Sequence, residues 1–206
     1  LGRDGVITVE LAKGFKSDLV TVEGMQINRG YISPYFVNNT EKMLAGFDKP
    51  AVLLCSGKIS NVHDISHLLE ESLQSTTPIL LIADDFEGDA LQALVVNSSR
   101  GNLKACAIKS PGFGNARVGM MQDLSVMLDT DVYDTNGETL RSLSLSSLGR
   151  CSKVSISRSD TVFVDCPAEK ESIESQASSI REALENPMLT HDEITILKVR
   201  LARLAG

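Results

Sequence analysis

Three short apolar runs decide the fold of this 206-residue chain: AVLLC (51–55), ILLIA (79–83) and KACAI (104–108). Their length and apolar character are typical of buried strands. The stretches between them, near residues 61–75 and 88–100, carry apolar side chains at the spacing of amphipathic helices. This β-α-β-α-β order predicts parallel strands covered by helices, and therefore a mixed α/β fold.

The residues around these runs support the same interpretation. Pro78 and Gly101 stand where a strand should start and where a helix should stop. Residues 154–156 and 161–165 predict a hairpin, and residues 7–10 and the segment around Tyr31 and Tyr35 suggest extended structure. We therefore expect one principal domain in the middle of the chain.

The C-terminal stretch has a different composition. Residues 168–185 and 190–205 are charged, free of glycine and periodically apolar, and Asn186-Pro187 separates them. This pattern predicts two antiparallel helices that pack on each other and on the domain. The first apolar stripe comprises Ile173, Ala177, Ile180 and Leu184, and the second comprises Ile194, Leu197, Leu201 and Leu204.

Charge and hydropathy limit the class of partner. The formal net charge is −7 and the basic residues are scattered. This argues against a nucleic-acid or anionic-membrane partner, because neutralising phosphates requires a clustered cationic face. No apolar run approaches the roughly 20 residues of a membrane helix, and no signal-peptide pattern opens the chain. We expect a soluble, cytoplasmic protein.

The cysteines and the first residues give two further expectations. The four cysteines are widely spaced and form no C-x-x-C pair, so we expect buried reduced thiols rather than a disulfide or a metal site. The chain starts at Leu1 without a methionine and runs directly into a strand-like segment. From this we expect an excised fragment of a longer protein.

A β-α-β-α-β order invites a nucleotide-binding hypothesis, which the sequence does not support. In KSPGFGNARVG (109–119), Gly112 and Gly114 are present, but Arg117 stands where a dinucleotide fingerprint needs its third glycine. The Gly-Lys-Ser/Thr of a phosphate-binding loop does not occur in the chain. We expect a structural turn here, no catalytic residue and no cofactor bound by this chain.

The densest acidic cluster consists of Asp84, Asp85, Glu87 and Asp89. Its spacing imitates the start of a calcium loop, but the glycine comes too early and Val96 occupies the place of the bidentate glutamate. We interpret these carboxylates as helix N-terminal residues that complement exposed N–H groups and the helix dipole. Three histidines lack a partner at metal-ligand or triad spacing and are expected on the surface: His63, His67 and His191.

The two predicted helices carry more apolar residues than one buried face requires. In the second helix Leu91, Leu94 and Val95 lie on one face, while Val96 lies about 100 degrees further round from Val95. The first helix carries a wide stripe of Ile65, Leu68, Leu69 and Leu73. Periodicity alone leaves two interpretations open, which are broad core faces or an exposed apolar binding surface.

The stretch EGMQINRGYISPYFVNN (23–39) places Tyr31, Tyr35 and Phe36 within six residues of an otherwise aromatic-poor chain, and predicts a sticky surface element. Three other motifs accompany it: SNVHDISHLLEESL (60–73), DDFEGDALQALVVNSSRG (84–101) and KSPGFG (109–114). Together they closely resemble the apical domain of the bacterial group I chaperonin large subunit, the GroEL family. The resemblance covers essentially the whole chain in collinear order.

The resemblance implies a swivelling β/β/α fold, in which helices flank a β-sandwich-like core. It divides the chain into strands from the intermediate-domain side (1–22), an apical substrate-binding core (23–166) and a C-terminal helical pair leading back to the intermediate domain (167–206). Gly24 matches a hinge of the family, where the missing Cβ would open backbone angles closed to other residues.

The family's groove lies between two neighbouring apical helices and the tyrosine-rich segment, and it binds non-native polypeptides and the mobile loop of the co-chaperonin. The matching apolar residues are Tyr31, Tyr35, Phe36, Leu69, Leu91, Val95 and Val96. Ser66 stands where the family typically has leucine, and His67 where it has proline. This more polar end of the groove bears on co-chaperonin affinity, whereas substrate capture should survive.

Charged positions also follow the family only in part. Asp89 and Arg100 match an acid–base pair, and Arg29 matches an arginine that links neighbouring subunits. Glu87 matches the acid of a further pair, but Asn39 replaces its usual lysine. A charged run of the family is replaced by residues 115–118. These departures suggest a divergent paralogue with weaker coupling between subunits.

The implied function is that of a molecular chaperone whose full-length subunits form a protein-folding ring driven by ATP and Mg²⁺. The nucleotide site of the family lies outside this chain, so the isolated fragment should be monomeric and should bind clients without turnover. The implied partners are non-native polypeptides, the co-chaperonin and sister subunits. The alternative is a structural or scaffold domain of a divergent paralogue with weakened or lost folding activity.

Overall fold

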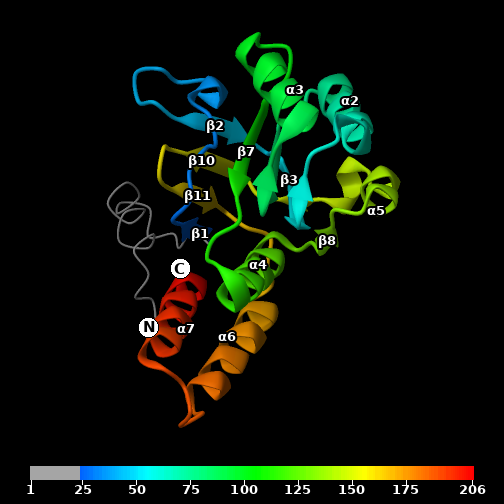
Figure 1. Cartoon of the computed structure of the whole chain (residues 1–206). Coiled ribbons are helices and arrows are strands. Elements are labelled where there is room, and N and C mark those ends of the chain that lie inside the picture. Colours follow the sequence, from blue (N-terminus) through cyan, green and yellow to red (C-terminus); the bar gives the residue numbers. More distant parts are fainter. Residues whose placement is uncertain (1–23) are drawn as a thin grey trace.

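The computed structural model describes residues 24–206. The extended structure expected at residues 7–10, and the whole of segment 1–22, lie outside these residues. The described part contains two main β-sheets and six α-helices, which confirms the mixed α/β class (Figure 1).

The larger sheet confirms the predicted parallel strands. Its strands follow the order β7-β5-β3-β8, and all three of these pairings are parallel. Because helices cover both faces of such a sheet, its two central strands are almost entirely apolar. The strands are β3 (Ala51–Ser56), β5 (Ile79–Ala83), β7 (Ala105–Lys109) and β8 (Val132–Asp134), with short β9 (Gly149–Arg150) antiparallel to β3.

Three helices connect these strands. Helices α2 (Ser66–Ser75) and α3 (Gly88–Ser99) are crossovers that step in one direction along the sheet, so right-handed connections place both on the same face. Helix α4 (Gly114–Leu128) returns the chain to the other edge of the sheet and covers the opposite face, where it contacts β3, β8 and β9. Helix α4 and strand β8 were not predicted from the sequence.

The first crossover helix is shorter than expected. A 3₁₀ turn, η2 (Val62–Asp64), precedes α2. The Asn61 side chain accepts a hydrogen bond from the backbone N–H of His63 at 2.9 Å, and Asp89 accepts one from the N–H of Val62 at 2.9 Å. These two side chains accept hydrogen bonds from N–H groups at the start of the 3₁₀ turn. The α-helix begins only at Ser66.

The second sheet is antiparallel, with the order β1-β11-β10-β2. It contains the predicted hairpin, in which β10 (Lys153–Ile156) pairs with β11 (Thr161–Val164), flanked by β1 (Gly24–Ile27) and β2 (Ala45–Asp48). The chain passes between the two sheets from β2 to β3 and from β9 to β10. Smaller elements are η1 (Pro34–Phe36), α5 (Gly137–Ser142), η3 (Leu145–Ser147) and the pair of β4 (Lys58–Ile59) with β6 (Asp85–Phe86).

The two predicted C-terminal helices are present as α6 (Lys170–Leu184) and α7 (His191–Ala205). They pack on each other and on α4, and form the lower end of the molecule in Figure 1. Ala177, Ile180 and Leu204 are buried in their contacts. The start of α7 is fixed by a capping box, because Thr190 Oγ1 accepts from the N–H of Glu193 and Glu193 Oε1 accepts from the N–H of Thr190.

The glycine predicted to act as a hinge lies at the start of a strand. Gly24 begins β1 and pairs with Val164, and its φ does not lie in the left-handed region. A Cβ at this position would lie 2.5 Å from the carbonyl oxygen of Phe163. Close approach to β11, rather than an unusual backbone angle, therefore explains the glycine.

Candidate binding surface

The tyrosine-rich segment is only partly exposed. Tyr35 is 65% exposed and Tyr31 is half-buried, but Phe36 is only 3% exposed. The prediction that this segment displays its aromatic side chains on the surface is therefore wrong for Phe36. The 3₁₀ turn η1 directs this ring inward, and η1 packs against α3 and β7.

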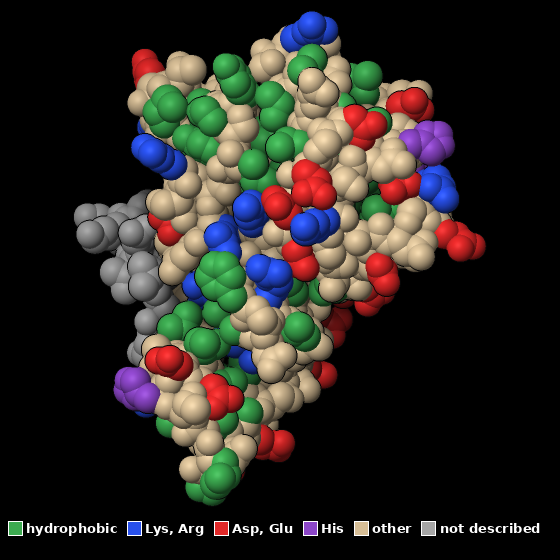
Figure 2. Space-filling model, viewed as in Figure 1, with side chains coloured by type: hydrophobic (Ala, Val, Ile, Leu, Met, Phe, Trp, Pro, Cys, Tyr) green, Lys and Arg blue, Asp and Glu red, His purple; other side chains and the backbone are tan. Residues whose placement is uncertain are grey.

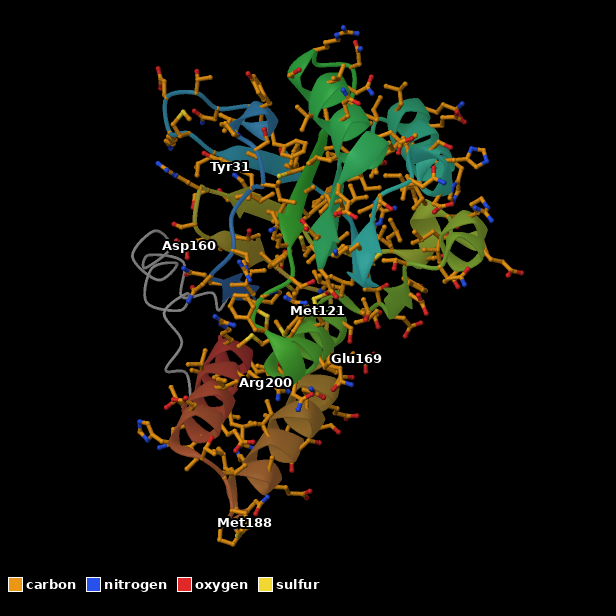
Figure 3. The ribbon with its side chains drawn as sticks, in the orientation of Figure 1. Tyr31, Met121, Asp160, Glu169, Met188 and Arg200 are labelled. Atoms are coloured by element: carbon orange, nitrogen blue, oxygen red, sulfur yellow. The ribbon has the colours of Figure 1, made fainter. Side chains whose placement is uncertain are left out.

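Local hydrogen bonds hold Tyr31 and Tyr35 in place. Ser33 caps η1 by accepting from the N–H of Tyr35, and Pro34 stands at its first position. The Tyr31 hydroxyl donates to the carbonyl of Met43 at 3.3 Å, and the Tyr31 backbone forms a β-bridge with Ile108. The segment is thereby anchored to the edge of the parallel sheet (Figure 3).

Helix α3 divides the predicted apolar residues between core and surface. Leu94 is fully buried, whereas Leu91 and Val95 are half-buried and pack against the core. Val96, one position further round, is also half-buried. The same helix therefore supplies apolar side chains both to the core and to the surface.

Helix α2 supplies less surface than expected. Ile65, Leu68 and Leu69 are buried against the core, so the expected exposure of Leu69 is wrong. Leu73, one turn beyond Leu69, is 55% exposed. Ser66 is half-buried at the first position of α2, and its hydroxyl donates to the carbonyl of His63 at 3.3 Å.

Two of the three histidines lie on the surface, but His67 does not. His63 and His191 are exposed, whereas His67 is half-buried and its Nε2 lies 2.8 Å from the carbonyl oxygen of Leu143. A carbonyl can only accept, so this ring nitrogen carries the proton. The surface prediction is wrong for His67 because the segment after α5 packs beside α2.

Hydrophobic side chains gather on the upper part of the face shown in Figure 2, over η1, the following loop and α3. We call this area the η1–α3 surface and define it by Tyr35, Met43, Leu91, Val95 and Val96. Met43 was not predicted to belong to this surface. Its position after polar residues and before Leu44 could have indicated that it is exposed. A hollow of about 420 Å³ lies beside it, with Phe36, Phe47 and Leu103 among its lining residues.

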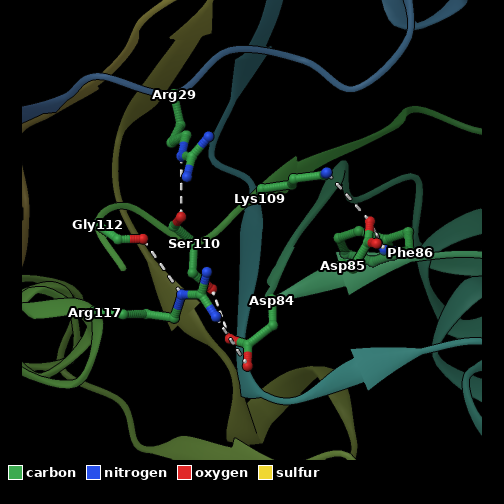
Figure 4. A network of polar contacts seen from close by, with 8 residues as sticks. All are labelled: Arg29, Asp84, Asp85, Phe86, Lys109, Ser110, Gly112 and Arg117. Atoms are coloured by element: carbon green, nitrogen blue, oxygen red, sulfur yellow. Dashed lines mark hydrogen bonds and ion pairs between the residues drawn. The ribbon is translucent and has the colours of Figure 1, made fainter. Parts of the chain in front are cut away.

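The interpretation of the acidic cluster as helix N-terminal residues is confirmed for Asp89, which lies in the first turn of α3, and is wrong for Asp84 and Asp85. Glu87 occupies the N-cap position of α3, but its side chain caps nothing. Asp84 pairs with Arg117 at 3.4 Å and accepts from the Ser110 hydroxyl. Asp85 pairs with Lys109 at 3.6 Å and accepts from the N–H of Phe86 (Figure 4). These carboxylates join the C-terminal ends of β5 and β7 to α4.

The same network contains Arg29 and Arg117. Arg29 donates from Nε to the carbonyl of Ser110 at 3.1 Å (Figure 4), and its guanidinium lies 5.1 Å from the ring centre of the exposed Phe113. Arg117 lies 5.9 Å from the same ring. The turn that carries Phe113 uses left-handed backbone at Gly112 and Gly114, in agreement with the predicted structural turn.

Asp89 and Arg100 do not pair within the chain. Asp89 is in the first turn of α3 and bonds to the N–H of Val62, while Arg100 is the C-cap of the same helix. A helix of this length separates its ends by roughly 16 Å at 1.5 Å per residue, which exceeds the reach of the two side chains. The length of α3 therefore excludes a pair between these two side chains within one chain.

Residues 24–206 contain neither a cluster of metal-ligating side chains nor a helix suited to cross a membrane. Within residues 24–206, no group of three or more His, Cys, Asp or Glu side chains is placed to hold a metal ion. In the same range, no helix combines the length and the apolar character needed to cross a membrane. No protein-family model matches the chain.

The four cysteines, all within residues 24–206, are buried, as predicted, and none of them forms a disulfide. Burial raises the pKa of Cys55 to about 12, assisted by the nearby Asp84 and Asp134, and raises that of Cys151 to about 11. Burial also raises the pKa of Cys106. Because the thiolate is the reactive form, these groups should be inert.

We expect Cys55, Cys106 and Cys151 to react with an alkylating reagent at pH 8 at least about a hundredfold more slowly in the native chain than in denaturant. Mass spectrometry of peptides after timed alkylation measures the rates. The unfolded chain is the control, since its thiols have ordinary pKa values. Rapid modification of any of the three in the native chain would contradict this prediction.

Proposed function

We propose that this chain is a chaperonin-type apical domain that binds non-native polypeptides on the η1–α3 surface. The observation that carries the proposal is the exposed Tyr35 on η1, which packs against α3 and its half-buried apolar side chains. An exposed apolar patch on a segment that hydrogen bonds hold in place is suited to bury the side chains of an unfolded chain. In the proposal the fold is the swivelling β/β/α fold of the GroEL family.

The geometry changes which residues we assign to the groove. Phe36 and Leu69 support the surface from within the core, while Tyr31 fixes the segment that displays Tyr35. The ligand would contact Tyr35, Met43, Val96 and the outer edges of Leu91 and Val95. Leu73 adds an exposed apolar side chain on α2, whereas Ser66 places a polar side chain at the first position of that helix.

The wider proposal concerns the full-length protein. There, sister subunits would form a ring, ATP and Mg²⁺ would bind outside this chain, and a co-chaperonin would compete for the same surface. Arg29, Glu87, Asp89 and Arg100 are proposed contacts with sister subunits; Glu87 and Arg100 are supported by their exposure. Weak single sites would then hold one client through several subunits at once.

A scaffold role is the second candidate, and one observation favours it. Much of the apolar surface expected from the sequence is already used by the core, since Phe36 and Leu69 are buried and Leu91 and Val95 are partly so. In that case the remaining patch would be covered by another domain of the same protein, and free polypeptide would not bind.

The two candidates differ in one measurement, the binding of a reduced, unfolded test protein to the chain by fluorescence anisotropy. On the chaperone hypothesis, Val96→Glu should weaken binding about tenfold or more, because a charge is placed against apolar ligand groups. Val199→Glu is the matched control, since Val199 is an exposed valine on α7, far from this surface. Absence of binding by the parent chain, or equal losses in both variants, would favour the scaffold.

A further inference from the structure

A buried carboxylate lies between the α/β core and the C-terminal helices. Asp123 is on α4, and its side chain is only 4% exposed. Helix α4 contacts the parallel sheet through β3, β8 and β9 on one side, and α6 and α7 on the other. Figure 3 shows Arg200 of α7 beside α4, which carries the labelled Met121. Asp123 is therefore placed where two parts of the molecule meet.

Both oxygens of Asp123 are bound by the C-terminal helices. Arg200 of α7 donates from Nε to Oδ2 at 2.7 Å and from Nη2 to Oδ1 at 2.9 Å. Gln176 of α6 donates from Nε2 to Oδ1 at 2.8 Å. A bidentate arginine and a carboxamide fix direction as well as distance, because the guanidinium and the carboxylate are both planar.

A glycine on α4 provides the space that the Arg200 guanidinium occupies. A Cβ on Gly119, one turn before Asp123 on α4, would lie 2.5 Å from Arg200 Nη1. The glycine leaves room for the guanidinium in the position that it occupies beside α4. Among the ion pairs of residues 24–206, Asp123–Arg200 is the only one that joins the C-terminal helices to the core.

Apolar packing alone does not define how these helices dock. The stripes of α6 and α7 repeat apolar residues at every turn, with Ile173, Ala177 and Ile180 on α6. A repeating stripe can slide by one turn and still bury similar apolar area, whereas a buried ion pair is satisfied in one register and leaves a costly unpaired charge in any other.

We propose that Asp123, Arg200 and Gln176 form a register latch, which holds α6 and α7 on α4 in one position so that the helical pair moves with the α/β core as one body. The latch makes α4 a connection through which a displacement at the C-terminal end reaches the parallel sheet, while α7 also contacts β1 of the antiparallel sheet. This role is independent of what the η1–α3 surface binds.

Hydrogen exchange measured by mass spectrometry on the whole chain tests the latch. Asp123→Asn should speed exchange of the amides of α6 and α7 by about tenfold or more, with little change in β3, β5 and β7, because local opening precedes global unfolding. Arg200→Lys keeps the charge but loses the bidentate geometry, and should give an intermediate increase. Glu174→Gln is the control, since it removes only a surface pair with Arg181.

Two outcomes would overturn the proposal: unchanged exchange in α6 and α7, or equal acceleration throughout the chain. If Asp123→Asn does not fold, the double variant Asp123→Leu with Arg200→Leu replaces the latch by apolar contact. That variant should fold and show more than one set of amide resonances for α6 and α7. A single native-like set with native exchange rates would also overturn the proposal.

Discussion

Replacing Gly30 by alanine is expected to lower the free energy of unfolding by about 3 kcal/mol or more, which is the range of severe overpacking. A Cβ at Gly30 would lie 2.2 Å from the carbonyl carbon and oxygen of Arg158 and from the carbonyl oxygen of Ser157. All of these are backbone atoms of the turn between β10 and β11. No side-chain rotation can relieve the clash, so the backbone must separate.

Separation at this crossing would break other contacts. The N–H of Tyr31 donates to the carbonyl of Ser157 at 3.1 Å, and the Thr161 hydroxyl donates to the carbonyl of Arg29 at 2.6 Å. The segment then continues to the β-bridge between Tyr31 and Ile108 on the parallel sheet. Gly30 thus lies where the two sheets are tied together, close to the candidate surface.

Gly46→Ala is the matched control for this prediction. Gly46 lies in β2, its φ is not in the left-handed region, and a Cβ there would meet nothing within 4 Å. Its effect should stay within about 1 kcal/mol, because alanine mainly restricts the unfolded chain. In thermal unfolding, Gly30→Ala should lower the midpoint by about 6–12 °C. Similar shifts for the two variants would show that the crossing tolerates a side chain.

The parallel sheet could be predicted because its sequence signal is local. Strands β3 and β5 are buried on both faces, so nearly every side chain is apolar, and Pro78 marks the start of β5. The hairpin of β10 and β11 and the two C-terminal helices also carry their own patterns. In each of these elements, the environment of the strand or helix is regular along its length.

Helix α4 was not predicted because its environment is not regular along its length. It is covered by the sheet on one side and by α6 and α7 on the other, so its apolar residues do not form a single stripe. Asp123, a charged residue, is among its most buried side chains. The spacing of Met121, Leu124 and Leu128 was a usable helical signal, but an arginine and a glycine in the first half obscured it.

The candidate surface was predicted in outline but not side chain by side chain. The sequence identifies which segments carry excess apolar residues, and both η1 and α3 do display them. It cannot distinguish Tyr35 from Phe36, because the twist of a 3₁₀ turn and the position of α3 decide which ring points inward. Leu69 is buried for the same reason, since its exposure depends on how α2 is rotated against the sheet.

Tyr35→Ser is expected to weaken the binding of an unfolded polypeptide by about tenfold to a hundredfold without lowering thermal stability. Burying one large side chain against a ligand contributes roughly 1.5 to 3 kcal/mol, and each 1.4 kcal/mol is about a factor of ten in affinity. Tyr35 is 65% exposed in the free chain, so folding gains little from its ring. The Ser33 cap of η1 is made to the backbone N–H of residue 35 and survives the substitution.

Met188→Ser is the matched control, because it also removes one exposed apolar side chain. Met188 is 84% exposed in the turn between α6 and α7, at the opposite end of the molecule from Tyr31 (Figure 3). If any exposed apolar residue attracts unfolded chains, the two variants should lose affinity equally in an anisotropy titration. If the η1–α3 surface is the site, only Tyr35→Ser should do so, and Tyr35→Phe should retain binding because the ring remains. Full binding by Tyr35→Ser with an unchanged melting curve would remove Tyr35 from the site and, with it, the observation on which the proposed function rests.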